Sequence, residues 1–216
     1  MNANEMTVFI IDDDPAVRDA LSLMIGQANL TVKDFGNARE FLAFYRPEMP
    51  GCAIVDINMP GMNGIQLQEE LIARGILLPI IFLTAHGDIP LSVKTIKAGA
   101  SDFLAKPVSC EKLLTSVQTA LRECENLVHH RKINQHSQAL LATLTQREQD
   151  VMMLVLDGQT NKKIAQHLGI SHRTVEIHKA RLMQKTGAEN LLDLARIVQD
   201  AGLTIGHGLP IDEHRR

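Results

Sequence analysis

Four short apolar runs near the start of this chain each end on a charged or hydroxyl side chain. TVFIID ends on Asp12, with Asp13 next; CAIVD ends on Asp56; IIFLT ends on Thr84; and DFLAK ends on Lys106. Apolar runs of this length between helical patterns predict buried parallel strands. Ligands of an open α/β sheet bind beyond the carboxyl ends of its strands. We therefore expect three carboxylates, a hydroxyl and an ammonium to meet at a single sheet edge.

The spacing of these runs predicts the α/β fold class, with a flavodoxin-like, doubly wound sheet of five parallel strands. The strand order 2-1-3-4-5 is expected, because its switch point lies between the first and third strands and brings Asp12, Asp13 and Asp56 together. Strands are expected at 7–12, 30–35, 52–56, 79–84 and 101–105, and helices at 15–28, 37–46, 63–74, 89–98 and from residue 109.

A second, all-α domain of four helices is predicted in the last third of the chain. Thr145 and Glu148 fit a capping box for a helix that ends near Gly158. The next helix ends at Gly169, and after a short turn Ser171 can cap the basic helix HRTVEIHKARLMQKTG. A glycine-closed helix, a short turn and a capped basic helix are typical of a helix-turn-helix.

The expected boundaries place the first domain at 1–122, a helical and polar linker at 123–141, the helix-turn-helix domain at 142–204 and a disordered tail at 205–216. The segment HHRKINQHSQA at 129–139 has no apolar stripe and is therefore assigned to the linker. Three cysteines lack metal-ligand spacing, and neither an apolar run of about 18 residues nor an export signal is present. These features predict a cytoplasmic protein without a membrane partner.

Charge is distributed unevenly along the chain. Residues 1–120 carry nine Lys and Arg against 14 Asp and Glu, whereas residues 121–216 carry 13 against 11. Between Asn161 and Gly187, six basic residues accompany a single acid, Glu176. An acidic first domain and a locally basic helix predict different partners for the two domains.

The expected cluster of carboxylates predicts phosphoryl chemistry. Three carboxylates in one small site repel one another unless a cation holds them, and ligation by oxygen alone suits Mg²⁺. Thr84 and Lys106 at the same edge would donate to phosphoryl oxygens. A carboxylate nucleophile can form an aspartyl phosphate, and Asp56, at the end of a central strand, is the best candidate.

Four segments, IIDDDPAVR, VDINMPGMNG, LTAHGDIP and GASDFLAKPV, closely resemble the receiver domain of two-component response regulators. The resemblance covers residues 5–122 and implies that Asp56 is the phosphoacceptor. It further implies that Asp13, Asp56 and the backbone carbonyl of Asn58 bind Mg²⁺ directly, with Asp12 acting through water.

The same resemblance implies that Thr84 and Lys106 bind the phosphoryl group, that the peptide bond after Lys106 is cis, and that Phe103 is an aromatic switch residue. Phosphorylation would rearrange Thr84 and Phe103 and alter the surface of the fourth helix, fifth strand and fifth helix. Candidate dimer contacts on that surface are Ile89, Val93, Lys97 and Asp102. Alternatively, Phe103 is an ordinary aromatic residue of the core, and the dimer candidates belong to an ordinary surface of mixed polarity.

The basic helix is expected to lay one face in the major groove of DNA. Val175, His178 and Leu182 share the opposite face and are expected to pack inward. On the DNA-facing stripe, Glu176 can accept from a cytosine amino group and Ile177 can contact a thymine methyl. Arg173 and Arg181 lie on the same stripe, and Lys162, Lys163, Thr174, Lys179 and Lys185 are the expected phosphate contacts.

The segment from LTQREQDV to LARIV resembles the LuxR-type DNA-binding domain, and SHRTVEIHKA together with TAHGDIP is similar to the FixJ branch. The two resemblances imply a bacterial, cytoplasmic transcription factor, not an enzyme acting on a separate substrate. A sensor histidine kinase would phosphorylate Asp56, and a homodimer would bind double-stranded promoter DNA with two half-sites. RNA polymerase is a further candidate partner.

Two other functions stay open at this point. A Mg²⁺-dependent aspartyl-phosphate phosphatase would use Asp12 as nucleophile and Asp14 as acid, and would have no use for a DNA-binding domain. A phosphorylation-independent DNA-binding regulator would use its first domain only to dimerise. The phosphatase would still form a phosphoenzyme when Asp56 is replaced by asparagine, whereas the response regulator would not. The phosphorylation-independent regulator would bind DNA equally with and without phosphorylation.

Overall fold

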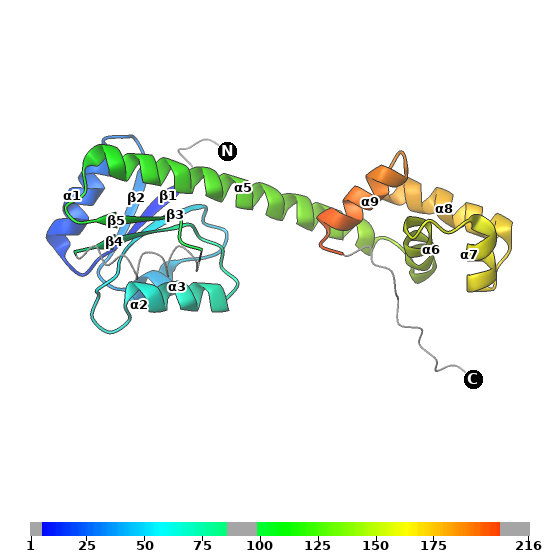
Figure 1. Cartoon of the computed structure of the whole chain (residues 1–216), viewed down its shortest axis with the longest axis horizontal. Helices are drawn as coiled ribbons and strands as arrows, with labels where there is room; N and C mark the ends of the chain where they lie inside the picture. Colours follow the sequence, from blue (N-terminus) through cyan, green and yellow to red (C-terminus); the bar gives the residue numbers. More distant parts are fainter. Residues whose placement is uncertain (1–5, 86–98, 204–216) are drawn as a thin grey trace. The chain divides into compact units, whose positions relative to one another are not determined.

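The computed structural model describes residues 6–85 and 99–203, which fold into two compact units, 1–128 and 129–216 (Figure 1). The first unit contains a sheet of five parallel strands in the order β2-β1-β3-β4-β5. The strands are β1 Thr7–Ile11, β2 Thr31–Phe35, β3 Gly51–Asp56, β4 Ile80–Thr84 and β5 Asp102–Ala105. The predicted fold class and strand order are therefore confirmed.

Helices cover both faces of this sheet: α1 and α5 lie on one face, and α2 and α3 on the other (Figure 1). Their bounds are α1 Pro15–Gly26, α2 Ala38–Phe44, α3 Gly64–Ala73 and α5 Cys110–Ala142. Asp14, Asn37 and Asn63 accept backbone hydrogen bonds at the N-termini of α1, α2 and α3. The helix expected at 89–98 lies outside the described residues, as do the dimer candidates Ile89, Val93 and Lys97.

Alternate residues of each central strand enter two separate apolar cores. Val8 and Ile10 of β1 pack toward α1 and α5, whereas Phe9 and Ile11 pack toward α2 and α3. A strand covered on both faces needs apolar residues at every position. This requirement explains the uninterrupted apolar runs, each of which stops where the strand reaches the sheet edge.

The second unit contains four further helices, α6 Gln146–Leu156, α7 Asn161–Leu168, α8 His172–Thr186 and α9 Leu191–Asp200. The capping box predicted for Thr145 and Glu148 is present, and Ser171 caps α8. Gly169 ends α7 in the left-handed region, at φ 65°, where a residue without a side chain is favoured. Val175 and Leu182 on the inner face of α8 are buried in the apolar cores of this unit.

Residues 129–139, assigned from the sequence to a helical and polar linker, are helical and belong to α5. No glycine or proline interrupts residues 110–142, so nothing in the backbone chemistry stops the helix. The end of α5 packs within the second unit, where Leu141 is buried and the Gln138 side chain donates to the Ala201 carbonyl oxygen. Residues 129–139 lack an apolar stripe because most of their side chains are exposed or half-buried.

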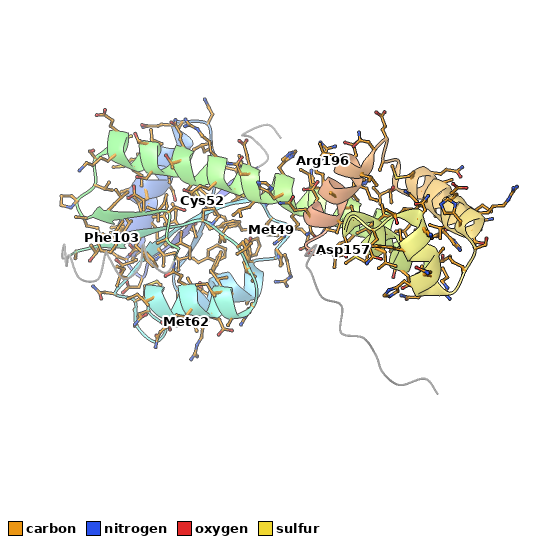
Figure 2. The ribbon with its side chains drawn as sticks, turned by 45° about the vertical axis from the view of Figure 1, so that its right-hand side comes forward. Met49, Cys52, Met62, Phe103, Asp157 and Arg196 are labelled. Atoms are coloured by element: carbon orange, nitrogen blue, oxygen red, sulfur yellow. The ribbon has the colours of Figure 1, made fainter. Side chains whose placement is uncertain are left out.

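All three cysteines lie within the described residues and none forms a disulfide. Cys52 on β3 (Figure 2) and Cys124 on α5 are buried, whereas Cys110, the first residue of α5, is exposed. Burial, with smaller contributions from Cys124 and Glu123, raises the pKa of the Cys52 thiol far above its ordinary value. Among the described helices, none is long and apolar enough to cross a membrane.

Candidate functional site

The polar residues at the strand ends converge on the carboxyl edge of the sheet. Asp12 follows β1, Asp56 ends β3, Thr84 ends β4 and Lys106 follows β5. Because β1, β3, β4 and β5 are successive neighbours, their ends lie side by side. Asp12 and Thr84 are each 1% exposed and Asp56 is 6% exposed, so these three side chains are buried, whereas Asp13 is exposed.

Lys106 joins two of these carboxylates. Its Nζ lies 2.6 Å from Asp12 Oδ2 and 2.9 Å from Asp56 Oδ1. Partial burial lowers the pKa of Lys106, but hydrogen bonds and attraction from both carboxylates outweigh that effect and raise its pKa above the ordinary value. The backbone N–H of Lys106 donates to the Thr84 carbonyl oxygen at 2.7 Å, and the following Lys106–Pro107 bond is cis, as the family resemblance implied.

The loop that follows Asp56 holds its side chain in place through a backbone hydrogen bond. Its Oδ2 accepts the Asn58 backbone N–H at 3.0 Å, and the Gly64 N–H donates to the Ile57 carbonyl oxygen at 3.0 Å. A side chain at Gly64 would place its Cβ 2.5 Å from the Asp56 carbonyl oxygen. Gly64 is thus required for the close approach of α3 to the site, and sequence reasoning did not single it out.

Arg18 is a second residue that sequence reasoning missed. From the first turns of α1, its Nη1 donates to the Asp12 carbonyl oxygen at 2.7 Å, and its Nε donates to Asp34 Oδ2 at 3.2 Å. Its place one helical turn after the Asp14 cap was visible in IIDDDPAVR. Nothing in that pattern showed which acceptors a flexible arginine would reach.

The donor set is compatible with a hard cation but does not form a ready-made cage. Within the described residues, no three His, Cys, Asp or Glu side chains gather closely enough to enclose a metal. Mg²⁺ keeps several waters and commonly uses only one or two protein carboxylates. Asp12 and Asp56, which both contact the Lys106 ammonium, supply two carboxylates against one positive charge, a donor set that suits that ion.

The expected switch residue Phe103 and the dimer candidate Asp102 lie on β5, which pairs with the strand that ends in Thr84. Phe103 on β5 is half-buried (Figure 2) and packs against the core on the α2 and α3 side of the sheet. Asp102, the dimer candidate within the described residues, is half-buried and accepts hydrogen bonds from the Phe103 backbone and the Ser116 hydroxyl. Its carboxylate thus already has partners within its own chain.

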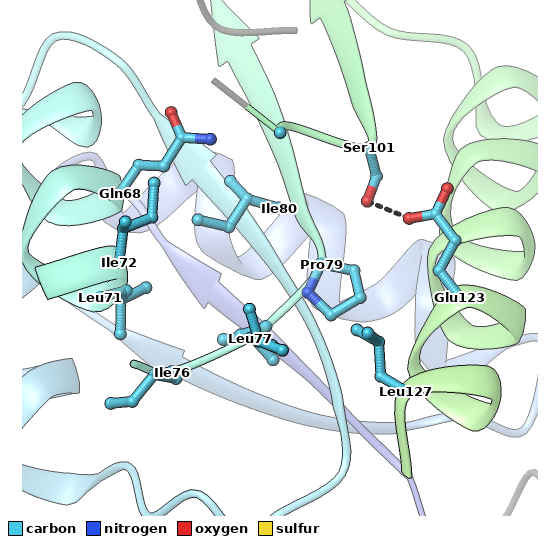
Figure 3. Close-up of a pocket in the computed structure, with 12 residues that line it drawn as sticks. Gln68, Leu71, Ile72, Ile76, Leu77, Pro79, Ile80, Ser101, Glu123 and Leu127 are labelled. Carbon is cyan, nitrogen blue, oxygen red and sulfur yellow. Dashed lines mark hydrogen bonds between the residues drawn. The ribbon is translucent and has the colours of Figure 1, made fainter. Parts of the chain in front are cut away.

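A separate pocket of about 270 Å³ lies at the other end of the strands, between α3 and α5 (Figure 3). Apolar side chains such as Leu71, Ile72 and Leu77 line it, and Ser101 and Glu123 hydrogen-bond to each other at its wall. Ile80, the first residue of β4, also lines it. It is therefore distinct from the carboxylate site at the opposite edge.

In the second unit, α8 presents the stripe that its spacing predicted. Arg173, Glu176, Ala180 and Arg181 are exposed, and Ile177 is 44% exposed, whereas Val175 and Leu182 are buried. Glu176 Oε1 lies 3.5 Å from His172 Nδ1. His178 points inward as expected, and among the described residues its buried Nδ1 has no hydrogen-bond partner.

The lysines of this unit differ in how free they are. Lys162 and Lys163 are exposed on α7, and Lys179 Nζ donates to Asn161 Oδ1 at 3.2 Å. Lys185 Nζ instead lies 2.7 Å from Glu148 Oε2 and 3.0 Å from the Thr143 carbonyl oxygen. The Lys185 ammonium therefore ties α8 to the start of α6.

Comparison with known proteins assigns both units. Residues 8–118 match the response regulator receiver domain, and residues 142–198 match the bacterial regulatory proteins of the luxR family. The chain belongs to the response regulators. This response regulator is 38% identical to nodulation protein W of Bradyrhizobium diazoefficiens over 93% of its own length and 88% of that protein's. It is 40% identical to the transcriptional regulatory protein TdiR of Thauera aromatica, covering 90% and 86%.

Solved structures agree with the assignment. The response regulator StyR matches with a TM-score of 0.79 at 41% identity, covering 90% of this chain and 98% of that one. Full-length FixJ from B. japonicum matches with a TM-score of 0.56 at 36% identity, covering 92% and 98%. A receiver domain followed by a LuxR-type DNA-binding domain makes this response regulator a DNA-binding transcriptional regulator of the FixJ type.

Proposed function

We propose that this response regulator takes a phosphoryl group onto Asp56 from a sensor histidine kinase and that the modification controls promoter binding. The observation that supports the proposal most directly is the Lys106 ammonium held between Asp12 and Asp56, at 2.6 and 2.9 Å. Such a bridge places a positive charge where a phosphoryl group on Asp56 would carry its oxygens.

In the transfer, an Asp56 carboxylate oxygen attacks phosphorus while the bond from phosphorus to the kinase histidine nitrogen breaks. Asp56 loses its carboxylate charge on forming the acyl phosphate, so Lys106 exchanges its Asp56 partner for a phosphoryl oxygen. The Thr84 hydroxyl, on the neighbouring strand end, supplies a second donor. Asp12, Asp13, Asp56 and the Asn58 carbonyl would hold Mg²⁺, which when bound would neutralise charge on the transferring group.

For DNA binding, we propose that the exposed stripe of α8 enters the major groove. Arg173, Arg181, Glu176 and Ile177 would face the bases, with Glu176 accepting from a cytosine amino group and Ile177 against a thymine methyl. The proposed phosphate contacts are Lys162, Lys163, Thr174 and Lys179. Lys185 is left out of this set, because its ammonium is bonded to Glu148 and the Thr143 carbonyl.

We further propose that phosphorylation promotes a homodimer that binds two half-sites in the bacterial cytoplasm and acts on RNA polymerase. Rearrangement of Thr84 and Phe103 would connect the site to the dimer surface that includes Asp102. This part of the proposal depends on the family resemblance and on the position of Phe103 on the strand next to Thr84.

The test compares the wild-type chain, Asp56→Asn and the matched control Asp19→Asn, an exposed carboxylate on α1. Acetyl phosphate with Mg²⁺ should phosphorylate the wild type and the control but not Asp56→Asn, as resolved on a phosphate-affinity gel. Phosphorylation should also raise the mass toward a dimer and tighten binding to DNA selected from a random pool. Phosphoprotein retained in Asp56→Asn would favour the phosphatase alternative, and unchanged DNA binding would favour the phosphorylation-independent regulator.

A further inference from the structure

Arg18 connects the acidic edge of the sheet to α1 and β2 with a two-pronged contact. Its Nη1 donates to the Asp12 carbonyl oxygen at 2.7 Å, and its Nε donates to Asp34 Oδ2 at 3.2 Å. The Arg18 side chain is only 18% exposed, so both bonds are made in a partly desolvated place. Arginine holds two acceptors in fixed directions because its guanidinium is planar.

The acceptor on Asp12 is the one polar atom of that residue whose partner comes from α1. The Asp12 N–H donates to the Phe35 carbonyl oxygen at 3.2 Å, Oδ1 accepts the Asp14 N–H at 3.0 Å, and Oδ2 accepts from Lys106. The carbonyl belongs to the peptide group that joins Asp12 to Asp13. Arg18 thus fixes the plane of that peptide, and with it the direction in which Asp13 leaves the strand.

Asp13 has no comparable anchor of its own. Its side chain is exposed and takes part in none of the hydrogen bonds or ion pairs among the described residues. We propose that Arg18 is a positioning residue, which holds the backbone between Asp12 and Asp13 in the conformation that presents Asp13 to a divalent cation. The inference depends on the proposed function, because it assumes that the cation assists phosphoryl transfer to Asp56.

Charge and geometry make opposite predictions for Arg18. A positive guanidinium near the carboxylates repels a divalent cation, so its removal would strengthen cation binding if charge alone mattered. If Arg18 acts by position, its removal weakens binding, and loss of a residue that orients a metal ligand typically lowers affinity by about tenfold or more. The sign of the change therefore distinguishes the two roles.

The experiment measures Mg²⁺ affinity of the full-length chain by isothermal titration calorimetry for the wild type, Arg18→Ala and Arg18→Lys. We expect both variants to bind Mg²⁺ about tenfold more weakly. Arg18→Lys keeps the charge but loses the planar fork, so its loss cannot come from charge. Arg74→Ala is the matched control, since Arg74 is exposed after the end of α3, pairs with Glu70 one turn earlier and should leave Mg²⁺ affinity unchanged.

Tighter Mg²⁺ binding in Arg18→Ala, with Arg18→Lys unchanged, would overturn the inference and leave Arg18 an electrostatic residue. Affinity unchanged in both variants would overturn it as well. Thermal unfolding followed by circular dichroism verifies that each variant is folded. If Arg18→Ala does not fold, the Mg²⁺ affinity of Arg18→Lys still decides the test. Failure of the proposed function is seen separately, as absence of phosphorylation in the wild-type chain.

Discussion

Replacing Glu148 with glutamine removes a buried charge from the second unit while keeping the size of the side chain. Glu148 is 2% exposed, and its Oε2 accepts from Lys185 Nζ at 2.7 Å and from the Thr145 N–H at 2.8 Å. The hydrogen bond from Lys185, followed by the bond from Thr145, lowers the pKa of Glu148 from 4.5 to about 2.

That lowering corresponds to roughly 3 kcal/mol in favour of the charged, folded form. Lys185 is 35% exposed, so solvent screening reduces the figure, and we expect Glu148→Gln to lower the free energy of unfolding by about 2 kcal/mol at pH 7. The stabilisation is present above pH 4.5, the unfolded value, and is lost as the pH falls toward 2. The difference between wild type and variant should therefore shrink steadily below pH 4.5.

Urea unfolding at several pH values measures this difference. Tyr45, the only tyrosine in a chain without tryptophan, packs against Phe9 and Phe41 and its fluorescence follows the first unit alone. Circular dichroism at 222 nm follows the helices of both units, so the transition not seen by Tyr45 belongs to the second. Glu189→Gln, at an exposed carboxylate, is the control. A loss below about 0.5 kcal/mol at pH 7, or one that does not change down to pH 3.5, would refute the reasoning.

Three further perturbations follow from the same structure. Gly64→Ala should destabilise the first unit by about 1–3 kcal/mol, because its Cβ would lie 2.5 Å from the Asp56 carbonyl oxygen. Urea unfolding followed by Tyr45 fluorescence measures the loss, and a variant as stable as the wild type would contradict the close approach of α3. Leu182→Ala should cost the second unit about 3 kcal/mol by circular dichroism, since Leu182 is 1% exposed, and a cost below about 1 kcal/mol would argue against tight packing. Lys162→Gln should weaken binding equally on all DNA sequences and reduce the salt dependence of log affinity by about one; an altered sequence preference would contradict a phosphate contact.

Much of the fold could be predicted because its signals are local in sequence. The apolar runs that stop at Asp12, Asp56 and Thr84 determine the strands and their common edge, and the capping box of Thr145 and Glu148 is contained in four residues. These patterns report on burial and on backbone hydrogen bonds made by near neighbours.

The remaining features depend on partners far apart in the chain. Lys185 was expected at a phosphate, but its partner Glu148 lies 37 positions earlier. Arg18 reaches a main-chain oxygen, which every residue carries and which no side-chain pattern marks. The unbroken course of α5 through residues 129–139 leaves no positive pattern in the sequence, because helix continuation needs only the absence of a stop signal.

The distribution of the three cysteines gives this regulator a natural attachment point for a probe. Cys110 is exposed at the first residue of α5, four positions beyond Lys106, while Cys52 and Cys124 are buried. The raised pKa of Cys52 keeps its thiol protonated, and a protonated thiol is a poor nucleophile. A maleimide dye or spin label should therefore attach at one position of the unmodified sequence. It would report on the end of β5, which is followed by Lys106, the residue proposed to bind the phosphoryl group.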